Sequence, residues 1–347
     1  MAKNKNLTQA KIKKDSEWYT LISDVEKELK HYKSQFEGKV VYCNCDDPEE
    51  SNFWKFFELN FEEYKLKKLI STHYDAEKPT YKLELSADID GDGKITKGDI
   101  VKTPLKQNGD FRSEESINLL KESDIICTNP PWSLLNDYIG LLLKYNKDFL
   151  ILGNQNAVTY SNVFPGILSG KIRLGLSTNG SNRWFEVPSS YAPKANAAGY
   201  KVENGKAYLF VNSVTWFTTL PQSEFYEELT LVKDFKLENY PVYDNSCFFY
   251  VNRVSNLPKD RKIKIPIPKN IEIWKNFYKN DLKIIGDECI INRPVFGVPI
   301  TFLYKHNPKQ FNLIGKTDSG KVTKYNLCNP TINGDNKFKH ILIRLSN

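Results

Sequence analysis

The sequence predicts an α/β protein built on a mostly parallel sheet, and three observations support this fold class. Apolar, β-branched runs alternate with stretches of helical periodicity from about residue 39 to residue 153. This alternation is typical of βαβ units, whose helices cover both faces of the sheet. The polar motifs follow the ends of the apolar runs, where ligands bind in such sheets. At 347 residues the chain also exceeds one typical domain, so we expect an appended module.

The first expected element is a helix from Asp15, a good N-cap, to about Phe36, because apolar residues recur there at helical spacing. Four apolar runs bounded by turn residues are the expected strands: residues 39–44, 68–74, 124–128 and 148–153. The helices between them are expected to begin near three serine residues: Ser51, Ser113 and Ser133. The segment at about 76–108 is interpreted as an irregular insertion, in which residues 81–85 alternate like a strand.

The pattern changes after residue 171. Residues 201–208 contain Asn204-Gly205, a favoured type I′ hairpin turn, and residues 208–217 can return as one long strand. Beyond about residue 237 Pro, Asn and Lys are frequent, and residues 271–278 are the best helix candidate. Three regions are therefore expected: an N-terminal arm and helix, a main domain with the insertion, and a smaller β-rich region, at 1–37, 38–235 and 236–347.

The net charge of +7 is unevenly distributed along the chain. Residues 1–235 hold 30 Lys and Arg against 33 Asp and Glu, whereas residues 236–347 hold 19 against 9. Basic runs are often no more than a solvated face. Attached to the base-gripping motif described below, however, this charge indicates a surface that binds the phosphates of a nucleic acid.

Other features of composition predict a cytoplasmic protein with no membrane partner. No apolar run is long enough to span a bilayer, and the Lys-rich start lacks the apolar core of a signal peptide. The six cysteines show no Cys-x-x-Cys spacing, and the four histidines do not cluster with them. We therefore expect free thiols in a reducing compartment.

The most informative motif is Asn129-Pro130-Pro131-Trp132, which follows an apolar strand directly. An exocyclic amine on an aromatic ring is a poor nucleophile, because its lone pair is delocalised. The Asn129 side-chain oxygen and the Pro130 carbonyl can accept hydrogen bonds from such an amine. The prolines keep the turn rigid, and Trp132 offers a flat face for base stacking, worth about 1–3 kcal/mol. The plainer interpretation is a Pro-Pro turn followed by a buried Trp.

More of the chain resembles one enzyme family. The segments 41–48, 51–53, 68–75, 109–116 and 153–157 occur in the order found in the EcoRI-type adenine-specific DNA methyltransferases. This resemblance implies a Rossmann-like sheet that binds S-adenosylmethionine, with helices on both faces and a smaller C-terminal target-recognition module. It also implies methyl transfer to adenine N6 in duplex DNA, after the base is flipped out of the stack.

The resemblance also assigns roles to residues of this sequence. The catalytic residues would be those of the motif: Asn129, Pro130, Pro131 and Trp132. The cofactor would be bound by seven residues: Asn44, Asp46, Pro48, Asp75, Asp110, Phe111 and Asn129. Among these Asp75 would hold the two ribose hydroxyls, and Asp110 with Phe111 would read the cofactor adenine. Ser113 is expected to cap the following helix instead.

Four residues are candidates for shaping the target-base pocket: Asn154, Asn156, Arg183 and Trp184. For the last two, a surface Arg183 beside a buried Trp184 is an equally good interpretation. The expected partners are double-stranded DNA and, within a restriction–modification system, a cognate restriction endonuclease. An enzyme of this kind would lie in the cytoplasm, associated with the nucleoid through its DNA.

Residues 88–99 do not belong to this pattern. They fit a twelve-residue calcium loop, with acids at positions 1, 3, 5 and 12 and glycine at position 6. The candidate ligands are Asp88, Asp90, Asp92, Lys94 and Asp99. The last is Asp rather than the usual Glu, so an acidic, glycine-rich turn is the alternative. A calcium ion here would be structural, because methyl transfer needs no metal.

The sequence leaves two other functions open. The same four-residue motif serves methyltransferases that act on RNA bases or on a glutamine amide of a protein. A non-catalytic nucleic-acid-binding or calcium-binding protein is the third interpretation. The basic final third argues against a protein substrate, the order of the motifs favours DNA, and the intact Asn129 to Trp132 segment argues against a non-catalytic protein.

Overall fold

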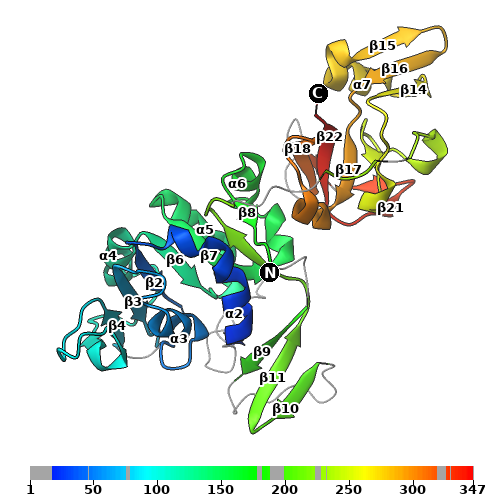
Figure 1. Ribbon diagram of the computed structural model, residues 1–347. Coiled ribbons are helices and arrows are strands. Elements are labelled where there is room, and N and C mark those ends of the chain that lie inside the picture. Colours follow the sequence, from blue (N-terminus) through cyan, green and yellow to red (C-terminus); the bar gives the residue numbers. More distant parts are fainter. Residues whose placement is uncertain are drawn as a thin grey trace. The chain divides into compact units, whose positions relative to one another are not determined.

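The chain forms two compact units, residues 1–222 and 223–347, which Figure 1 colours blue to green and yellow to red. The computed structural model describes residues 18–45, 47–75, 79–177, 182–187, 199–222, 228–231, 233–318, 326–328 and 330–346. The second unit holds 20 Lys and Arg against 13 Asp and Glu, and the first unit holds 29 of each. All of the net charge therefore lies in the second unit. The boundaries between the three expected regions, after residues 37 and 235, stay a prediction.

An eight-stranded mixed sheet forms the centre of the first unit. Its order is β5 (Val101–Pro104), β4 (Tyr81–Leu85), β3 (Lys68–Thr72), β2 (Val40–Cys43), β6 (Ile125–Thr128), β7 (Asp148–Asn154), β12 (Val214–Thr218) and β8 (Arg173–Leu174). The central strands β3, β2, β6 and β7 are parallel. The outer strands pair antiparallel with their neighbours, so the prediction of a mostly parallel sheet was wrong for the sheet as a whole. The predicted strands themselves are confirmed.

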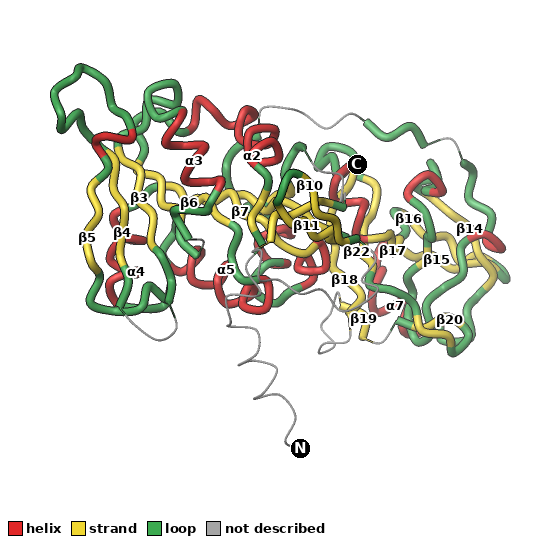
Figure 2. Tube along the Cα trace, turned by 90° about the horizontal axis from the view of Figure 1, so that it is seen from below, coloured by secondary structure: helices red, strands yellow, loops and turns green. Residues whose placement is uncertain are grey.

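Helices cover both faces of this sheet. Figure 2 shows α2 (Ile22–Leu29) and α3 (Asn52–Leu59) on one side, and α4 (Glu114–Glu122) and α5 (Leu135–Lys144) on the other. Alternate strand residues, among them Val41, Ile125 and Leu150, belong to the same buried cluster as the apolar side chains of α2 and α3. The intervening residues of these strands are buried as well, which fits a strand covered on both faces.

The order of the parallel strands reverses between β2 and β6. From β2 the chain adds β3 on one side, and it later adds β6 and β7 on the other. In open α/β sheets such a reversal opens a crevice outside the carboxyl ends of the strands, where ligands bind. The loops after β2, β3, β6 and β7 carry most of the motifs singled out in the sequence.

The N-terminal helix is shorter than the sequence predicted. Helix α2 begins at Ile22 and continues as a 3-10 helix over Lys30–Gln35, while Asp15 lies outside the described residues. Residues Tyr19–Thr20 form strand β1, which pairs antiparallel with β9 (Arg183–Val187). Pairing with a distant strand thus overrides the local helical periodicity.

The predicted hairpin is confirmed, but the long returning strand is wrong. Strands β10 (Tyr200–Glu203) and β11 (Lys206–Val211) pair antiparallel around Asn204 and Gly205, whose φ angles are 51° and 76°. Strand β11 ends at Val211, and β12 starts at Val214 in the larger sheet. Ser213 between them has a φ of 58°, a left-handed conformation that breaks the extended chain.

The second unit consists mainly of strands. A five-stranded sheet has the order β13 (Phe249–Tyr250), β17 (Phe296–Pro299), β22 (His340–Leu345), β18 (Phe311–Asp318) and β19 (Asn326–Cys328). A three-stranded sheet has the order β14 (Lys262–Pro266), β16 (Glu288–Asn292) and β15 (Leu282–Ile285). A two-stranded sheet pairs β20 (Thr331–Ile332) with β21 (Asp335–Asn336). Helix α7 (Ile271–Tyr278) has the predicted bounds and buries Trp274 against Phe249. No helix in the described part of the chain has the length and apolar character needed to cross a membrane.

A buried carboxylate fastens α2 to the loop after β8. Glu28 is fully buried and accepts hydrogen bonds from the Leu176 amide (2.9 Å), the Ser177 amide (2.7 Å) and the Tyr32 hydroxyl (3.0 Å). Glu28→Ala would leave three donors without this acceptor, so we expect the free energy of unfolding to fall by about 3 kcal/mol or more. Urea denaturation measures this. The exposed Glu26→Ala on the same helix is the control, and an equal loss there would contradict the account.

Candidate active site

The motif after β6 forms a turn whose polar groups are held in one arrangement. Asn129 Nδ2 donates to the Trp18 carbonyl at 2.7 Å, and Asn129 Oδ1 accepts from Trp132 Nε1 at 3.1 Å. A carbonyl can only accept and an indole N–H can only donate, so these two partners decide which way the carboxamide points. The oxygen retains a second lone pair for another donor, such as the amine that the sequence motif suggests.

Three aromatic rings pack edge to face around this carboxamide. The Trp132 centroid lies 5.8 Å from that of Trp18 and 5.9 Å from that of Phe185, with interplanar angles of 86° and 83°. Such pairs stabilise by about 0.5–1.5 kcal/mol beyond the area they bury. Trp132 is partly buried, which leaves both base stacking and simple packing open as its role.

Trp18 and Phe185 were missed in the sequence. Trp18 was placed inside a helix, and Trp184 was chosen over its neighbour Phe185. The signal was the alternation along β9, where Arg183, Phe185 and Val187 are buried and Trp184 and Glu186 are only partly so. Side chains one residue apart on a strand point to opposite faces, so Phe185 and not Trp184 reaches the motif.

Arg183 and Trp184 themselves lie in the four-stranded sheet of β1, β9, β11 and β10. Arg183 is 6% exposed, and its Nη1 pairs with Asp24 of α2 at 2.8 Å. Trp184 is partly exposed and packs against Phe210, with centroids 5.0 Å apart. The alternative of a surface Arg183 beside a buried Trp184 is therefore the reverse of what the structure shows.

The loop after β2 is tied to its neighbours through Asn44, which is buried. Its carbonyl accepts from the Thr128 hydroxyl, and its side-chain oxygen accepts from the Tyr138 hydroxyl at 2.5 Å. Cys45 has a φ of 76°, the conformation that a glycine of the usual Gly-x-Gly turn would adopt at no steric cost. Pro48 is buried, and Asp46 lies outside the described residues.

Asp75 and Asp110, two of the three carboxylates expected to bind the cofactor, lie on loops that are in close contact. The Asp75 amide donates to the Asn108 carbonyl at 3.0 Å. Gly109 has a φ of 75°, and a Cβ there would lie 2.0 Å from the His73 carbonyl oxygen, so only glycine lets the loops meet. The loop of Asp110 thereby lies against the end of β3, beside Asp75.

Asp110 and Phe111 are each engaged by the protein. Arg112 donates to both Asp110 oxygens at 2.9 and 2.6 Å and holds the pKa of that carboxyl below its usual range. Phe111 is buried edge to face on Tyr138, with centroids 5.0 Å apart. Ser113 accepts from the Ser116 amide at 3.2 Å, which confirms its predicted role as a helix cap.

Asn154 ends β7, the strand next to β6, so it reaches the same edge of the sheet as Asn129. Its side-chain oxygen accepts from the Asn156 amide at 2.9 Å, and Asn156 is exposed. The structure thus groups the cofactor candidates, the Asn-Pro-Pro-Trp motif and these two residues along one edge. Their contacts with cofactor and base stay predictions.

The acidic insertion brings only part of the predicted calcium set together. Oxygens of Asp88, Asp90 and Asp99 lie within 4.8 Å of one another. Asp99 already accepts from the backbone amides of residues 89, 90 and 96, at 2.6, 3.2 and 2.8 Å, and these bonds hold its pKa below the usual range. Asp92 and Lys94 are exposed and do not belong to this group. Calcium binding stays a prediction, with no added support here.

Comparison with known proteins agrees with this arrangement of fold and motif. A family model described as "Adenine-specific methyltransferase EcoRI" matches residues 6–293. The Type II methyltransferase M.EcoRI of Escherichia coli is 37% identical, over 99% of this chain and 97% of its own length. M.MgeORF184P of Mycoplasma genitalium is 33% identical over 98% of both chains, and M.MpnI of Mycoplasma pneumoniae is 34% identical over 88% and 84%. No solved structure matches this chain.

The sheet, the motif and these matches define a methyltransferase. More closely, the chain belongs to the family of EcoRI-type adenine-specific methyltransferases, since both the family match and the relatives cover most of it.

The carboxamide of Asn129 is expected to be irreplaceable by a carboxylate. In Asn129→Asp two acceptors, the carboxylate and the Trp18 carbonyl, would face each other, and the carbonyl would lose its donor. We expect methyl transfer to slow by about ten- to a hundredfold, as for a lost buried hydrogen bond. Asn60→Asp is the matched control, because Asn60 Nδ2 also donates to a backbone carbonyl at 2.7 Å. Equal losses of rate in both variants would contradict the assignment.

Proposed function

We propose that the protein transfers the methyl group of S-adenosylmethionine to the N6 amino group of adenine in duplex DNA, within a restriction–modification system or alone. The observation that carries this proposal is the fixed orientation of the Asn129 carboxamide, whose oxygen keeps a free lone pair at the carboxyl end of β6. The Asn-Pro-Pro-Trp turn lies beside the reversal of strand order, in a Rossmann-like sheet whose ligand site is expected there.

The residues at this edge suit S-adenosylmethionine chemically. Asp75 offers a carboxylate for vicinal hydroxyls, and the ionised Asp110 is an acceptor for an amino group, with Phe111 beside it. Asn44, Asp46 and Pro48 belong to the loop that would lie nearest the methionine part. When bound, the cofactor supplies an electrophilic methyl group on a sulfonium ion.

The part played by the chain is positioning and charge placement. Asn129 Oδ1 and the Pro130 carbonyl would accept the two amino hydrogens of the target, which draws electron density toward the nitrogen. The nitrogen would then lie in line with the transferred group, and its extra proton can leave after transfer without a tuned general base. The rings of Trp132, Trp18 and Phe185, which pack against one another next to Asn129, would limit the access of water to one side of the target amine.

DNA fits the remaining features better than the alternative substrates. The whole net charge lies in the second unit, which we propose as the target-recognition module that binds the phosphates. An adenine in a duplex must leave the stack before Asn129 can reach its amine, at a cost of a few kcal/mol. Asn154 and Asn156 are proposed to border the flipped base, whereas Arg183 and Trp184, predicted for the same pocket, would support it only indirectly through β9. We also propose that the protein acts at the nucleoid in the cytoplasm and that, within a restriction–modification system, it has a cognate restriction endonuclease.

Labelled S-adenosylmethionine offered with duplex DNA, RNA or cell protein separates the candidate substrates. We expect label in DNA alone, recovered as N6-methyladenine. Asn129→Ala should abolish this transfer because the oriented acceptor is gone, while DNA binding measured by fluorescence anisotropy is largely retained. Label in RNA or in protein glutamine with none in DNA would refute the proposed substrate, and activity in Asn129→Ala would remove Asn129 from its role.

A further inference from the structure

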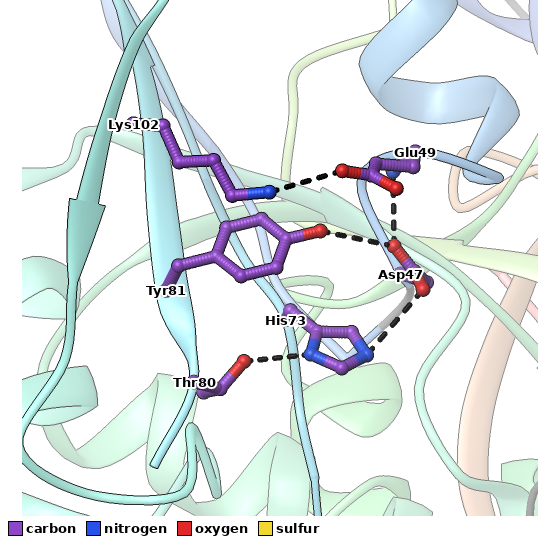
Figure 3. Close-up of polar contacts among 6 residues, drawn as sticks. All are labelled: Asp47, Glu49, His73, Thr80, Tyr81 and Lys102. Atoms are coloured by element: carbon purple, nitrogen blue, oxygen red, sulfur yellow. Dashed lines mark hydrogen bonds and ion pairs between the residues drawn. The ribbon is translucent and has the colours of Figure 1, made fainter.

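Six polar side chains join the loop after β2 to the end of β3 and to the β4–β5 insertion hairpin (Figure 3). We call this group the loop clamp: Asp47, Glu49, His73, Thr80, Tyr81 and Lys102. Asp47 Oδ2 lies 3.4 Å from His73 Nε2, and Asp47 Oδ1 accepts from the Tyr81 hydroxyl at 3.4 Å and from the Glu49 amide at 3.0 Å. His73 Nδ1 lies 2.6 Å from the Thr80 hydroxyl oxygen. One carboxylate is thus reached from two neighbouring strands.

The rings and cation of the loop clamp are stacked in layers. The His73 and Tyr81 rings are nearly parallel, at 17° and 5.3 Å between centroids, and Lys102 Nζ lies 3.6 Å from the Tyr81 centroid. Lys102 also pairs with Glu49 at 3.0 Å and holds the pKa of that carboxyl below its usual range. Burial, together with the nearby carboxylates of Asp47 and Glu49, raises the pKa of Tyr81, so its phenol stays protonated and donates.

The loop that this group holds has a local need for support. Cys45 is a non-glycine residue in the left-handed region, a conformation that persists only where surrounding contacts impose it. Asn44 is fixed from one side by Thr128 and Tyr138. On the other side of Cys45, the Asp47 carbonyl accepts from the Glu50 and Ser51 amides, which leads directly into α3. The Asp47 side chain ties this second half of the loop to β3, and together with the Glu49–Lys102 ion pair it ties the loop to the insertion hairpin.

We propose that the loop clamp is a positioning device that holds the described residues of the loop after β2, residues 44, 45, 47 and 48, in their cofactor-binding conformation, in place of the usual glycine-rich turn. The insertion hairpin thereby becomes part of the cofactor site without touching the cofactor, through Tyr81 and Lys102. This inference rests on the proposed function, since it takes the loop to bind S-adenosylmethionine. His73, Tyr81 and Lys102 are positioning residues acting through Asp47 and Glu49.

Binding of S-adenosylmethionine to the purified full chain by isothermal titration tests this. We expect His73→Gln to raise the Kd about tenfold, while kcat at saturating cofactor stays within about twofold and the KM for DNA is unchanged. Lys102→Met should act in the same direction by releasing Glu49. The double variant Asp47→Asn with His73→Gln should bind no more weakly than Asp47→Asn alone, because the two side chains act as one unit.

Glu84→Gln is the matched control. Glu84 lies on the same hairpin and pairs with Lys68 and Lys82 at 2.6 and 2.5 Å, and no hydrogen bond or ion pair joins it to the described residues of the loop after β2. An unchanged Kd in His73→Gln, or an equal rise in Glu84→Gln, overturns the inference. If the wild-type chain binds no S-adenosylmethionine at all, the proposed function fails instead, so the two failures are distinguishable.

An independent observation concerns Phe338, in the segment between β21 and β22. It is 90% exposed, more than any other large apolar side chain that the structure describes. Its backbone is nevertheless held on both sides: the Lys337 amide donates to the Pro330 carbonyl at 2.7 Å, and the Phe338 carbonyl accepts from Nδ1 of the buried His340 at 2.7 Å. Single exposed apolar side chains are common on protein surfaces, but a ring held out by a fixed backbone is available for stacking with a partner.

The surroundings of Phe338 favour a nucleic-acid partner. Lys337 and Lys339 flank it, in the unit that carries the whole net charge. The nearby Asp244 carboxylate accepts from the amides of Asn333 and Gly334, at 3.0 and 2.8 Å, and also attracts Lys337. We infer that Phe338 inserts into the base stack of bound duplex DNA, while the net positive charge of its unit attracts the flanking phosphates. This inference also rests on the proposed DNA substrate.

Fluorescence of a modified duplex tests the insertion. The methylation site of the enzyme is first mapped by sequencing modified bases, and a duplex with this site is then made with 2-aminopurine in place of the target adenine. Fluorescence of 2-aminopurine rises when it leaves the stack. We expect this rise, and the methylation rate of the natural duplex, to fall about tenfold or more in Phe338→Ala and to be retained in Phe338→Trp. Ile285→Ala, at a side chain 61% exposed in the same unit, is the control. Wild-type behaviour in Phe338→Ala, or an equal loss in Ile285→Ala, refutes the insertion; unmethylated DNA with the wild type refutes the substrate.

Discussion

The hydrogen bond from Asn129 to the Trp18 carbonyl is the interaction on which the candidate site depends. It joins the turn after β6 to the residue that directly precedes β1, and together with the Trp132 indole it decides the direction of the carboxamide. The pairing of β1 with β9 places Trp18 there, and the ion pair of Arg183 with Asp24 fastens β9 to α2. The residues that hold the Asn129 side chain are therefore spread over 170 positions of sequence, between about 18 and 187.

The loops after β2 and β3 show how a loop can be held in place without a glycine-rich turn. A non-glycine residue, Cys45, takes the left-handed conformation, and hydrogen bonds on each side keep it there. At Gly109, in contrast, the contact with the His73 carbonyl leaves no room for a side chain. His73 thus takes part twice, by its backbone against the loop of Asp110 and by its ring against Asp47. The loops after β2 and β3 and the loop before α4 are linked through this one residue.

The candidate site and the net positive charge of the chain lie in different units. The first unit is neutral in its count of charged side chains and contains the sheet and the motif, whereas the second is basic and consists mainly of strands. A basic unit attracts a polyanion from any direction and gives affinity without sequence information. Recognition of a particular adenine would need side chains that reach the bases, such as the ring of Phe338 and others in the same unit.

The sequence alone determined the central strands, the helices between them, the Asn204-Gly205 turn, the Ser113 cap and α7, because each rests on local periodicity or turn chemistry. It also identified the Asn-Pro-Pro-Trp motif and hence the family. Only the tertiary structure decided that the sheet is mixed, that Trp18 lies directly before strand β1 and at the motif, that Phe185 rather than Trp184 faces the motif, and that Asp47 is held by His73. Those outcomes depend on pairing and packing between segments far apart in the chain, and local propensity carries no information about such partners.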